Sequence, residues 1–494
     1  MFLSCKQGKT RMDKTITSSF VIPTEVAEAH TGEVAEFLYQ RLVLPRRKTV
    51  ENIQRTTFNH EHTLSFRLKD LKGKWHVDTA IKIGKTIEVN MVPSNEAVPP
   101  SEVLDELKDD IFITVHLFEE QLRRKTIYFA WVEGIKIIPE KAPFRKKRIF
   151  DKILFGNMIF LFIIFIVFSV FLFVLLEPFV GIYVPLVLVG VQFLIVLVAA
   201  KIIARGADWT ITEQNPNVHV LSYKVPPEEN WIFREKLSKD VLMKIKTEIY
   251  QETLARGKPI DCQTAQQVFS NYGLACIPEN MSTKIINVYK LVKTVAEKFE
   301  IPIPKIVVSN TVIPNAAATG PSPRHGMVLI TTGLLVQLKE EELLAVIGHE
   351  FSHLIGRDPL ILFGLTATEY LFRFYFIWPI ILVYDVLYFY LYFLLALSVI
   401  YFIAKFFEAR ADLVSAIRMG TPQVLAGALR KIGFKRLRLE KAKAFRFQTW
   451  VGLDPHPPIY FRIDRLEKLQ PTVNVKYPLL RSIKDCINGF FASF

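Results

Sequence analysis

Cysteine is scarce in this sequence, and it never takes the paired spacing of a cysteine metal site. The 494 residues contain four cysteines and no C-x2-C pair. This pattern excludes a disulfide framework and a cysteine zinc site, and we expect reduced thiols in cytosolic segments. The four positions are Cys5, Cys262, Cys276 and Cys486.

Two further absences concern how the chain is built and targeted. It contains no internal repeat and no low-complexity linker, which excludes a repeat architecture. The first residues lack the apolar run of a signal peptide, because basic residues interrupt them. Those residues are Lys6, Lys9, Arg11 and Lys14. Met12 is an alternative start to Met1.

Acidic residues are fewer than basic ones. The sequence has 48 Asp and Glu against 62 Lys and Arg, a formal net charge of +14. Hydrophobic residues make up 50% of the chain, and the mean hydropathy is +0.25. In a chain this apolar, excess positive charge predicts contact with anionic lipid headgroups rather than with nucleic acid.

The apolar residues gather in two blocks that predict membrane hairpins. The first block runs from 153 to 203, with spans at Ile153–Leu176 and Phe179–Ile203 divided near Pro178. Each span can cross about 30 Å of hydrocarbon. The alternative is a fully buried pair of soluble helices.

The second apolar block covers residues 359–404 and predicts two more spans, with a break at Trp378-Pro379. Its second half is strongly apolar. Its first half contains Glu369 and Arg373, whose i,i+4 spacing allows them to pair on one helix face. The pair is either structural or part of a route for substrate. Alternatively, the first half of this block enters the membrane without crossing it.

Positive charges flank both hairpins on the same side, and the short turns within them lack Lys and Arg. The positive-inside rule therefore predicts a plasma or inner membrane protein with both termini in the cytoplasm. The flanking residues are Lys141, Arg145, Lys146, Lys147, Arg148, Lys152, Lys201, Arg205, Arg357, Lys405 and Arg410.

The remaining segments predict soluble domains. Residues 14–140 are expected to form an α+β domain with a helix at Ser101–Arg124. Partly alternating residues predict strands at Thr63–Lys69 and Trp75–Val92, with a turn at Gly84-Lys85. It contains no catalytic motif, so we interpret it as a regulatory or substrate-engaging module. Residues 208–358 and 405–494 would form a second domain, with a helix at Lys284–Phe299. The basic helical tail from residue 420 is either a solvated face or a contact with the inner membrane surface.

The most informative stretch is His349-Glu350-Phe351-Ser352-His353. Two histidines four apart share one helix face, so both rings can bind one Zn²⁺, and Glu350 between them can act as a general base. Acidic residues at 340–342 favour a helix start, and Pro359 favours its end or a kink. The alternative is a partly buried helix whose histidines only form hydrogen bonds.

A catalytic zinc needs a third protein ligand and an open position. Glu408 is the best candidate, just past the last predicted span, with His456 as its rival. Asp412 shares a helix face with Glu408 and would accept the free N–H of a zinc-bound histidine. The alternative is a carboxylate pair without metal.

These motifs resemble those of the HtpX-like membrane zinc metallopeptidases, which are related to the CAAX prenyl proteases. The similarity covers about residues 289–469. The matching segments are Pro314-Asn315-Ala316, Thr331-Thr332-Gly333-Leu334-Leu335, His349–His353, Glu408-x-x-Ala411-Asp412, His456-Pro457-Pro458 and Arg462-Ile463.

The resemblance implies a multi-pass α-helical membrane protein with a mainly α zincin-type protease domain and a small edge β-sheet, holding one Zn²⁺ per chain. The N-terminal α+β domain and an insert near residues 435–446 depart from the family plan. Four spans fit the HtpX-like branch better than the CAAX prenyl proteases.

The expected reaction is peptide-bond hydrolysis, with Glu350 as the base and later the acid. Substrate would pair with an edge strand at Met327–Thr332. Asn315 and Ala316 would line the same cleft. His456 or Arg462 would stabilise the oxyanion, or would instead anchor the C-terminal tail.

The resemblance implies that the substrates are misfolded or surplus membrane proteins. Two alternatives remain open: processing of a lipidated, CAAX-type peptide, and a catalytically silent membrane scaffold. The sequence indicates neither the cleavage preference nor the oligomeric state. Another divalent metal could occupy a site of this ligand type.

Overall fold

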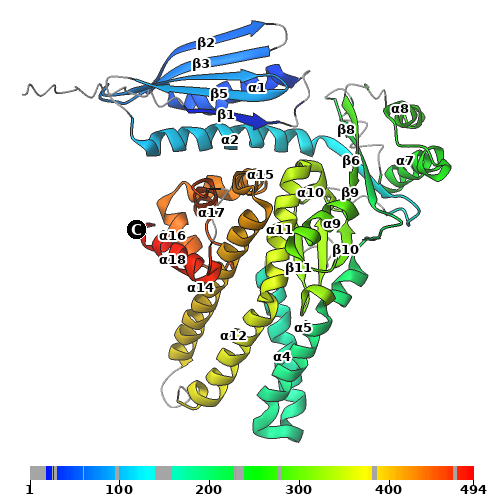
Figure 1. Ribbon diagram of the computed structural model, residues 1–494, viewed down its shortest axis with the longest axis vertical. Helices are drawn as coiled ribbons and strands as arrows, with labels where there is room; N and C mark the ends of the chain where they lie inside the picture. Colours follow the sequence, from blue (N-terminus) through cyan, green and yellow to red (C-terminus); the bar gives the residue numbers. More distant parts are fainter. Residues whose placement is uncertain are drawn as a thin grey trace, which may run out of the picture. The chain divides into compact units, whose positions relative to one another are not determined.

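The computed structural model describes residues 18–24, 26, 30–58, 61–94, 99–138, 158–226, 229, 238–274, 277, 280–380, 386–470 and 475–493. It divides into two compact units, Met1–Arg124 and Lys125–Phe494 (Figure 1). The alternative start at Met12, the basic segment 141–152 before the first predicted span and the first residues of that span lie outside the described residues.

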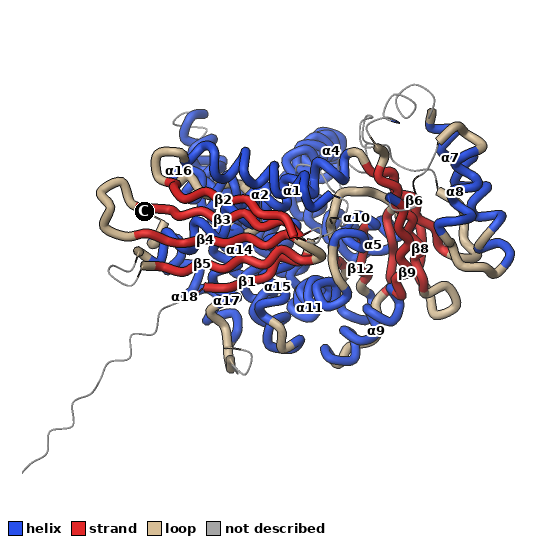
Figure 2. The backbone as a smooth tube through the Cα atoms, turned by 90° about the horizontal axis from the view of Figure 1, so that it is seen from above, coloured by secondary structure: helices blue, strands red, loops and turns tan. Residues whose placement is uncertain are grey.

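The first unit is an antiparallel sheet with strand order β1-β5-β4-β3-β2 and two helices (Figure 2). The predicted turn at Gly84 joins β4 and β5, and the helix predicted at Ser101–Arg124 is confirmed with those bounds. The elements are β1 Ser18–Pro23, α1 Thr31–Leu38, β2 Val50–Phe58, β3 Glu61–Lys69, β4 His76–Ile83, β5 Thr86–Pro93 and α2 Ser101–Arg124.

Alternating burial explains why these residues form a sheet with one covered face. In β5, Ile87, Val89 and Met91 are buried while the residues between them are exposed. Ile111 and Val115 of α2 belong to the same core. The period of two in the strands thus gives one apolar face, which the helices cover.

The second unit contains two small sheets, with orders β6-β8-β9 and β11-β12-β10-β7. Helices α7 and α8 share a core with the first of them. The strands are β6 Thr126–Val132, β7 Trp209–Ile211, β8 Asn217–Lys224, β9 Met281–Asn287, β10 Lys305–Ser309, β11 Ala316–Thr319 and β12 Met327–Thr331. The helices among them are α7 Lys239–Glu252, α8 Cys262–Ser270, α9 Val288–Phe299, α10 Thr332–Gln337 and α11 Glu340–Gly356.

Two sequence expectations change here. The helix predicted from Lys284 begins at Val288, because residues 281–287 pair with β8 as the edge strand β9. Asn287 instead caps the helix, its side chain accepting the N–H of Lys290. Strand β6 pairs with β8 in the second unit, although residues to 140 were expected in the N-terminal domain.

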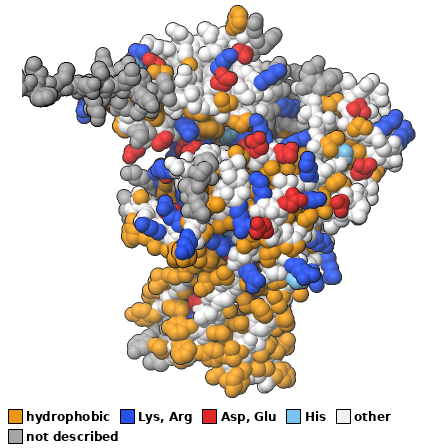
Figure 3. Space-filling model, in the orientation of Figure 1, with side chains coloured by type: hydrophobic (Ala, Val, Ile, Leu, Met, Phe, Trp, Pro, Cys, Tyr) orange, Lys and Arg blue, Asp and Glu red, His pale blue; other side chains and the backbone are white. Residues whose placement is uncertain are grey.

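Long apolar helices form the lower part of the second unit, and hydrophobic side chains cover their visible surface (Figures 1 and 3). Among the described residues, three helical stretches are long and apolar enough to cross a membrane: Val167–Gly206, Asp358–Ile380 and Leu387–Met419. The helices are α4 Met158–Val180, α5 Val184–Gly206, α12 Asp358–Phe372 and α14 Val386–Met419.

The breaks within these stretches differ from those predicted. Helix α4 continues past Pro178, and the turn to α5 lies at Gly181–Tyr183, where Gly181 adopts a φ of 55°. Gln192 of α5 donates a hydrogen bond to Ser169 of α4, so the two helices form a hairpin. Helix continues through Pro379 to Ile380, and the expected break at Trp378-Pro379 is not found there.

The C-terminal residues form four helices that pack on the upper part of α14. Trp450, Ala409 and Cys486 form their buried centre. Cys262 and Cys486 are both free thiols. The helices are α15 Pro422–Glu440, α16 Lys443–Val451, α17 Ile459–Glu467 and α18 Pro478–Phe491.

Candidate metal centre

Helices α11 and α14 approach each other closely because small residues face one another where they pack. Gly348 has no side chain, and a Cβ there would lie 2.9 Å from Oγ of Ser415. The Ser415 hydroxyl donates a hydrogen bond of 2.9 Å to the carbonyl of Ala345. This close approach brings polar residues of the two helices together.

The sequence of α11 sets both of its ends. The carboxylate of Glu342 accepts the backbone N–H of Lys339 at 2.8 Å, which caps the first turn. Arg357 adopts a left-handed conformation, with φ of 52°, and ends the helix. Pro359 then lies in the first turn of α12, as its fixed φ favours. The predicted end near Pro359 is therefore found at Gly356.

Three potential metal-binding side chains from α11 and α14 converge. Nε2 of His349 lies 3.2 Å from Nε2 of His353. Oε2 of Glu408 lies 3.5 Å from Nε2 of His349, and its Oε1 lies 3.4 Å from Nε2 of His353. The structure thus brings together the three residues that the sequence predicted as ligands, as one group that could hold a metal ion.

The geometry of this group fits a tetrahedral metal such as Zn²⁺. Ligand bonds of about 2.0–2.1 Å at tetrahedral angles place neighbouring ligand atoms about 3.3 Å apart. Within the described residues, Oε2 of Glu408 is buried and has no hydrogen-bond partner. A buried carboxylate oxygen without a donor is costly, and a cation would satisfy it.

The carboxylates around His349 stabilise positive charge at this site. Burial lowers the pKa of His349, but the carboxylates of Asp412 and Glu408 outweigh it and raise the pKa to about 10. Oδ1 of Asp412 lies 2.9 Å from Nδ1 of His349, beside the histidine that it was predicted to orient. Without metal, the ring carries a proton that a metal would displace.

Arg462 holds Asp412 in place. Its Nε and Nη2 donate hydrogen bonds of 2.8 and 2.7 Å to the two carboxylate oxygens of Asp412. Burial lowers the pKa of Arg462, but the carboxylates of Asp412 and Glu408 outweigh burial and raise the pKa, so the guanidinium stays charged. Its Nη1 lies 3.7 Å from Glu408. This paired geometry supports positioning rather than contact with substrate.

The sequence reasoning missed the partner of the second histidine. Nδ1 of His353 lies 2.7 Å from Oδ2 of Asp358. A carboxylate only accepts, so Nδ1 carries the proton and Nε2 keeps its lone pair for a metal. Arg410 contacts both oxygens of Asp358 at 2.7 and 2.8 Å. An aspartate just past the helix end was the available signal.

Glu350 contacts a different strand from the one predicted to pair with substrate. Its Oε2 accepts the backbone N–H of Ala318 at 2.8 Å. Ala318 belongs to β11, which is the edge of its sheet, whereas β12 pairs with both β10 and β11. The prediction of Met327–Thr332 as the edge strand is therefore wrong. Its local sequence pattern does not reveal that β11 pairs with its outer side.

The free edge of β11 presents backbone groups beside Glu350. The backbone N–H of Thr331 donates to the carbonyl of Asn315, so alternation turns the N–H and C=O of Ala316 away from β12. Asn315 and Ala316, predicted to line the cleft, stand directly before and at the start of this edge.

His456 lies beside the three ligand candidates but outside their group. Its Nε2 is 3.7 Å from Oε1 of Glu408, and its Nδ1 is 2.9 Å from Oδ1 of Asp454. Burial lowers the pKa of His456, but Glu408 and Asp454 outweigh it, so the pKa is raised. Arg436 in turn donates a 2.7 Å hydrogen bond to Asp454. His456 was the rival to Glu408 as third ligand, but the group of converging ligand atoms contains Glu408, and a partly exposed histidine that Asp454 holds in place suits contact with substrate better.

Comparison with known proteins agrees with this geometry. The model of peptidase family M48 matches residues 284–470. A Protease HtpX homolog from Thermodesulfovibrio yellowstonii is 43% identical over 94 residues, which is 19% of this chain and 32% of that protein. A Protease HtpX homolog from Moorella thermoacetica is 34% identical over 184 residues, covering 32% of this chain and 60% of that protein.

Another relative is Protease HtpX of Legionella pneumophila, 42% identical over 74 residues, which covers 15% of this chain and 26% of that protein. The chain thus spans between about a quarter and 60% of the length of these relatives. The resemblance predicted from the motifs is confirmed: residues 284–470 match the model of peptidase family M48, and the chain is similar to proteases named HtpX.

Proposed function

We propose that this protein is a membrane-embedded zinc endopeptidase. The observation that carries the proposal is the convergence of His349, His353 and Glu408, whose ligand atoms lie within 4.8 Å of one another. These residues would hold one Zn²⁺ per chain. When bound, the metal would supply a Lewis acid that activates water and polarises the scissile carbonyl.

The chain's own residues divide the remaining work. Glu350 takes a proton from the attacking water and passes it to the leaving amine. Asp412 and Asp358 hold the two histidine rings and keep each Nε2 free. His456, with its raised pKa, donates a hydrogen bond to the developing oxyanion. Arg462 keeps Asp412 charged and in place.

Substrate main chain binds as an added strand on the edge of β11. The outward N–H and C=O of Ala316 pair with an extended peptide and tolerate many sequences. This pairing places the scissile bond beside Glu350, because Glu350 contacts Ala318 two residues further along the same edge.

Four spans in two hairpins, α4 with α5 and α12 with α14, would hold the site at the membrane surface. The distribution of Lys and Arg supports a cytoplasmic site and cytoplasmic termini. The basic C-terminal helices and the net charge support contact with anionic headgroups. The N-terminal α+β unit has no catalytic motif and serves regulation or substrate engagement.

A cytoplasmic site next to the bilayer favours misfolded or surplus membrane proteins as substrates. The second candidate is a processing enzyme for lipidated peptides, which the relation to the CAAX prenyl proteases favours. The intact Glu350 and the complete ligand group argue against a silent scaffold.

The test compares wild type with Glu350→Gln on an unfolded soluble protein and on a lipidated peptide. Wild type and Glu350→Gln should each bind one metal ion per chain, because the substitution leaves the ligands intact. Only wild type should cleave. Cleavage of the lipidated peptide alone would favour the processing enzyme. Full cleavage by Glu350→Gln would refute the assignment of the base.

A further inference from the structure

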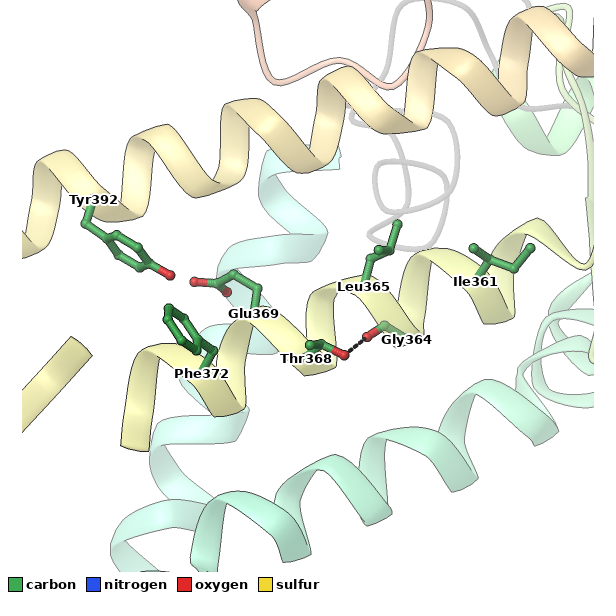
Figure 4. Close-up of a pocket in the computed structure, with 7 residues that line it drawn as sticks. All are labelled: Ile361, Gly364, Leu365, Thr368, Glu369, Phe372 and Tyr392. Carbon is green, nitrogen blue, oxygen red and sulfur yellow. Dashed lines mark hydrogen bonds between the residues drawn. The ribbon is translucent and has the colours of Figure 1, made fainter. Parts of the chain in front are cut away.

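A mostly apolar groove lies between α12 and α14, inside the stretches that are apolar enough to cross a membrane, and Glu369 is the charged residue in its lining. Its volume is about 540 Å³. One face of α12 from Ile361 to Phe372 lines it, and Tyr392 of α14 stands opposite (Figure 4). The hydroxyl of Tyr392 points toward the carboxylate of Glu369.

The groove combines a notch for a helix with a polar centre. Gly364 and Thr368 are four apart and both exposed, and a Cβ on Gly364 would meet nothing within 4 Å. Small residues at this spacing let another membrane helix approach closely. The Thr368 hydroxyl donates a hydrogen bond of 2.8 Å to the carbonyl of Gly364, so the polar centre is Glu369.

Glu369 lines the groove, and its carboxylate is held by neighbouring side chains. Arg373 donates hydrogen bonds of 2.8 and 3.2 Å to its two oxygens. The Arg373 guanidinium also lies 4.8 Å from the ring centre of Phe393 on α14. A carboxylate has about four acceptor positions. Arg373 fills two of them and the Tyr392 hydroxyl points toward the same carboxylate, so a position remains for a donor from the groove.

The same helix connects the groove to the metal centre. Asp358, the first residue of α12, holds His353. Glu369 lies eleven residues further along, about 17 Å at 1.5 Å per residue, which is roughly half of a 30 Å hydrocarbon layer. A helix seated in the groove at mid-membrane would lead its flanking segment toward the site.

We propose that this groove binds a transmembrane helix of the substrate and selects one with a polar, hydrogen-donating side chain near its centre. This inference rests on the proposed function and specifies its substrate class. A membrane subunit without its partner exposes such a side chain to lipid, which is costly. Glu369 offers it an acceptor, which explains how a protease would distinguish surplus from assembled membrane proteins.

The test uses Glu350→Gln protein in phosphatidylcholine–phosphatidylglycerol vesicles, so that binding is read without cleavage. The probes are two leucine–alanine transmembrane peptides, with a central asparagine or a central leucine, each carrying a diazirine. The asparagine peptide should cross-link about threefold more, as expected for one interhelical hydrogen bond in a membrane. A diazirine-bearing phosphatidylcholine reports lipid in the groove.

Gly364→Leu, which fills the notch, should reduce cross-linking of both peptides at least threefold. The matched control is Thr366→Leu, exposed on the same helix but outside the groove lining, and it should change nothing. Replacing both Glu369 and Arg373 by leucine should abolish the preference for asparagine while the peptides still bind.

Equal cross-linking of the two peptides, or an unchanged yield in Gly364→Leu, would overturn the proposal. Cross-linking of the lipid in place of either peptide would make the groove a lipid site and also overturn it. Cleavage assays of wild type on an unfolded soluble protein are scored separately. A protein that binds the asparagine peptide but cleaves nothing would therefore refute the proposed function and leave the groove assignment standing.

Discussion

The Nδ1 atom of His353 on α11 lies 2.7 Å from the carboxylate of Asp358, the first residue of α12. A residue at the start of an apolar helix thus orients a ring of the candidate metal centre. The turn at Arg357, with φ of 52°, makes this contact possible by redirecting the chain between the two helices. The candidate metal centre and the apolar helix α12 are therefore built from one continuous segment.

Asp358 should control metal affinity. Asp358→Asn keeps the size of the side chain but removes its charge, so we expect metal affinity to fall about 10–100-fold, as for other residues that orient metal ligands. Competition with a chromogenic chelator measures the affinity. The control is Asp464→Asn, since Asp464 is exposed on α17 and, within the described part of the chain, forms an ion pair only with Lys468. Equal affinities in the two variants would contradict the role of Asp358.

Gly356 should be required for packing against Arg410. A Cβ at position 356 would lie 1.9 Å from Nη2 of Arg410, so Gly356→Ala must displace the side chain that holds Asp358. Overpacking of this kind costs about 1–3 kcal/mol of unfolding free energy. Thermal unfolding in detergent tests it against Gly190→Ala in α5, where a Cβ meets nothing within 4 Å. A loss of stability in the Gly190 variant alone would refute this account.

Metal binding should release protons. The pKa of His349 is raised to about 10 in the metal-free site, so its imidazole is protonated at neutral pH. A metal needs the neutral ring, so binding displaces about one proton and the affinity falls as the pH is lowered from about 8 to 6. Calorimetric titration in buffers of different ionisation enthalpy measures the release. A pH-independent affinity with no proton release would contradict the geometry.

The edge of β11 should tolerate proline at only one of two neighbouring positions. The N–H of Ala318 faces Glu350, so Ala318→Pro removes that contact without breaking the sheet. We expect slower cleavage with unchanged metal content and little change in unfolding temperature. Ala317 pairs with Leu329 inside the hairpin, so Ala317→Pro removes a hydrogen bond of the sheet and should instead destabilise the fold by about 1–3 kcal/mol. The opposite assignment of the two effects would place the free edge elsewhere.

Local spacing was sufficient to predict the core of the candidate site. The i,i+4 relations of His349 with His353, and of Glu408 with Asp412, depend only on helical period, and the structure brings all four together. Apolar length likewise predicted the long helices, and alternation predicted the hairpin at Gly84.

What the sequence could not predict depends on contacts between distant segments. Asp358 reaches His353 only because Arg357 turns the chain in a left-handed conformation that favours glycine or asparagine, and no local pattern marks it. Strand order is equally non-local: β12 is apolar enough for a central strand, and only the folded hairpin makes β11 the edge. The local pattern of residues 284–287 predicts a helix. Pairing with β8 overrides that pattern, so these residues form part of strand β9.

The most direct test of the central claim is metal-dependent cleavage of an unfolded soluble protein by the purified, detergent-solubilised chain. The protein is stripped with a chelator, and Zn²⁺ is then returned in measured amounts. The proposed function predicts no cleavage by the stripped protein, recovery that saturates at one Zn²⁺ per chain, and no recovery in Glu350→Gln. Cleavage that persists in the stripped protein, or recovery that is equal in Glu350→Gln, would contradict it.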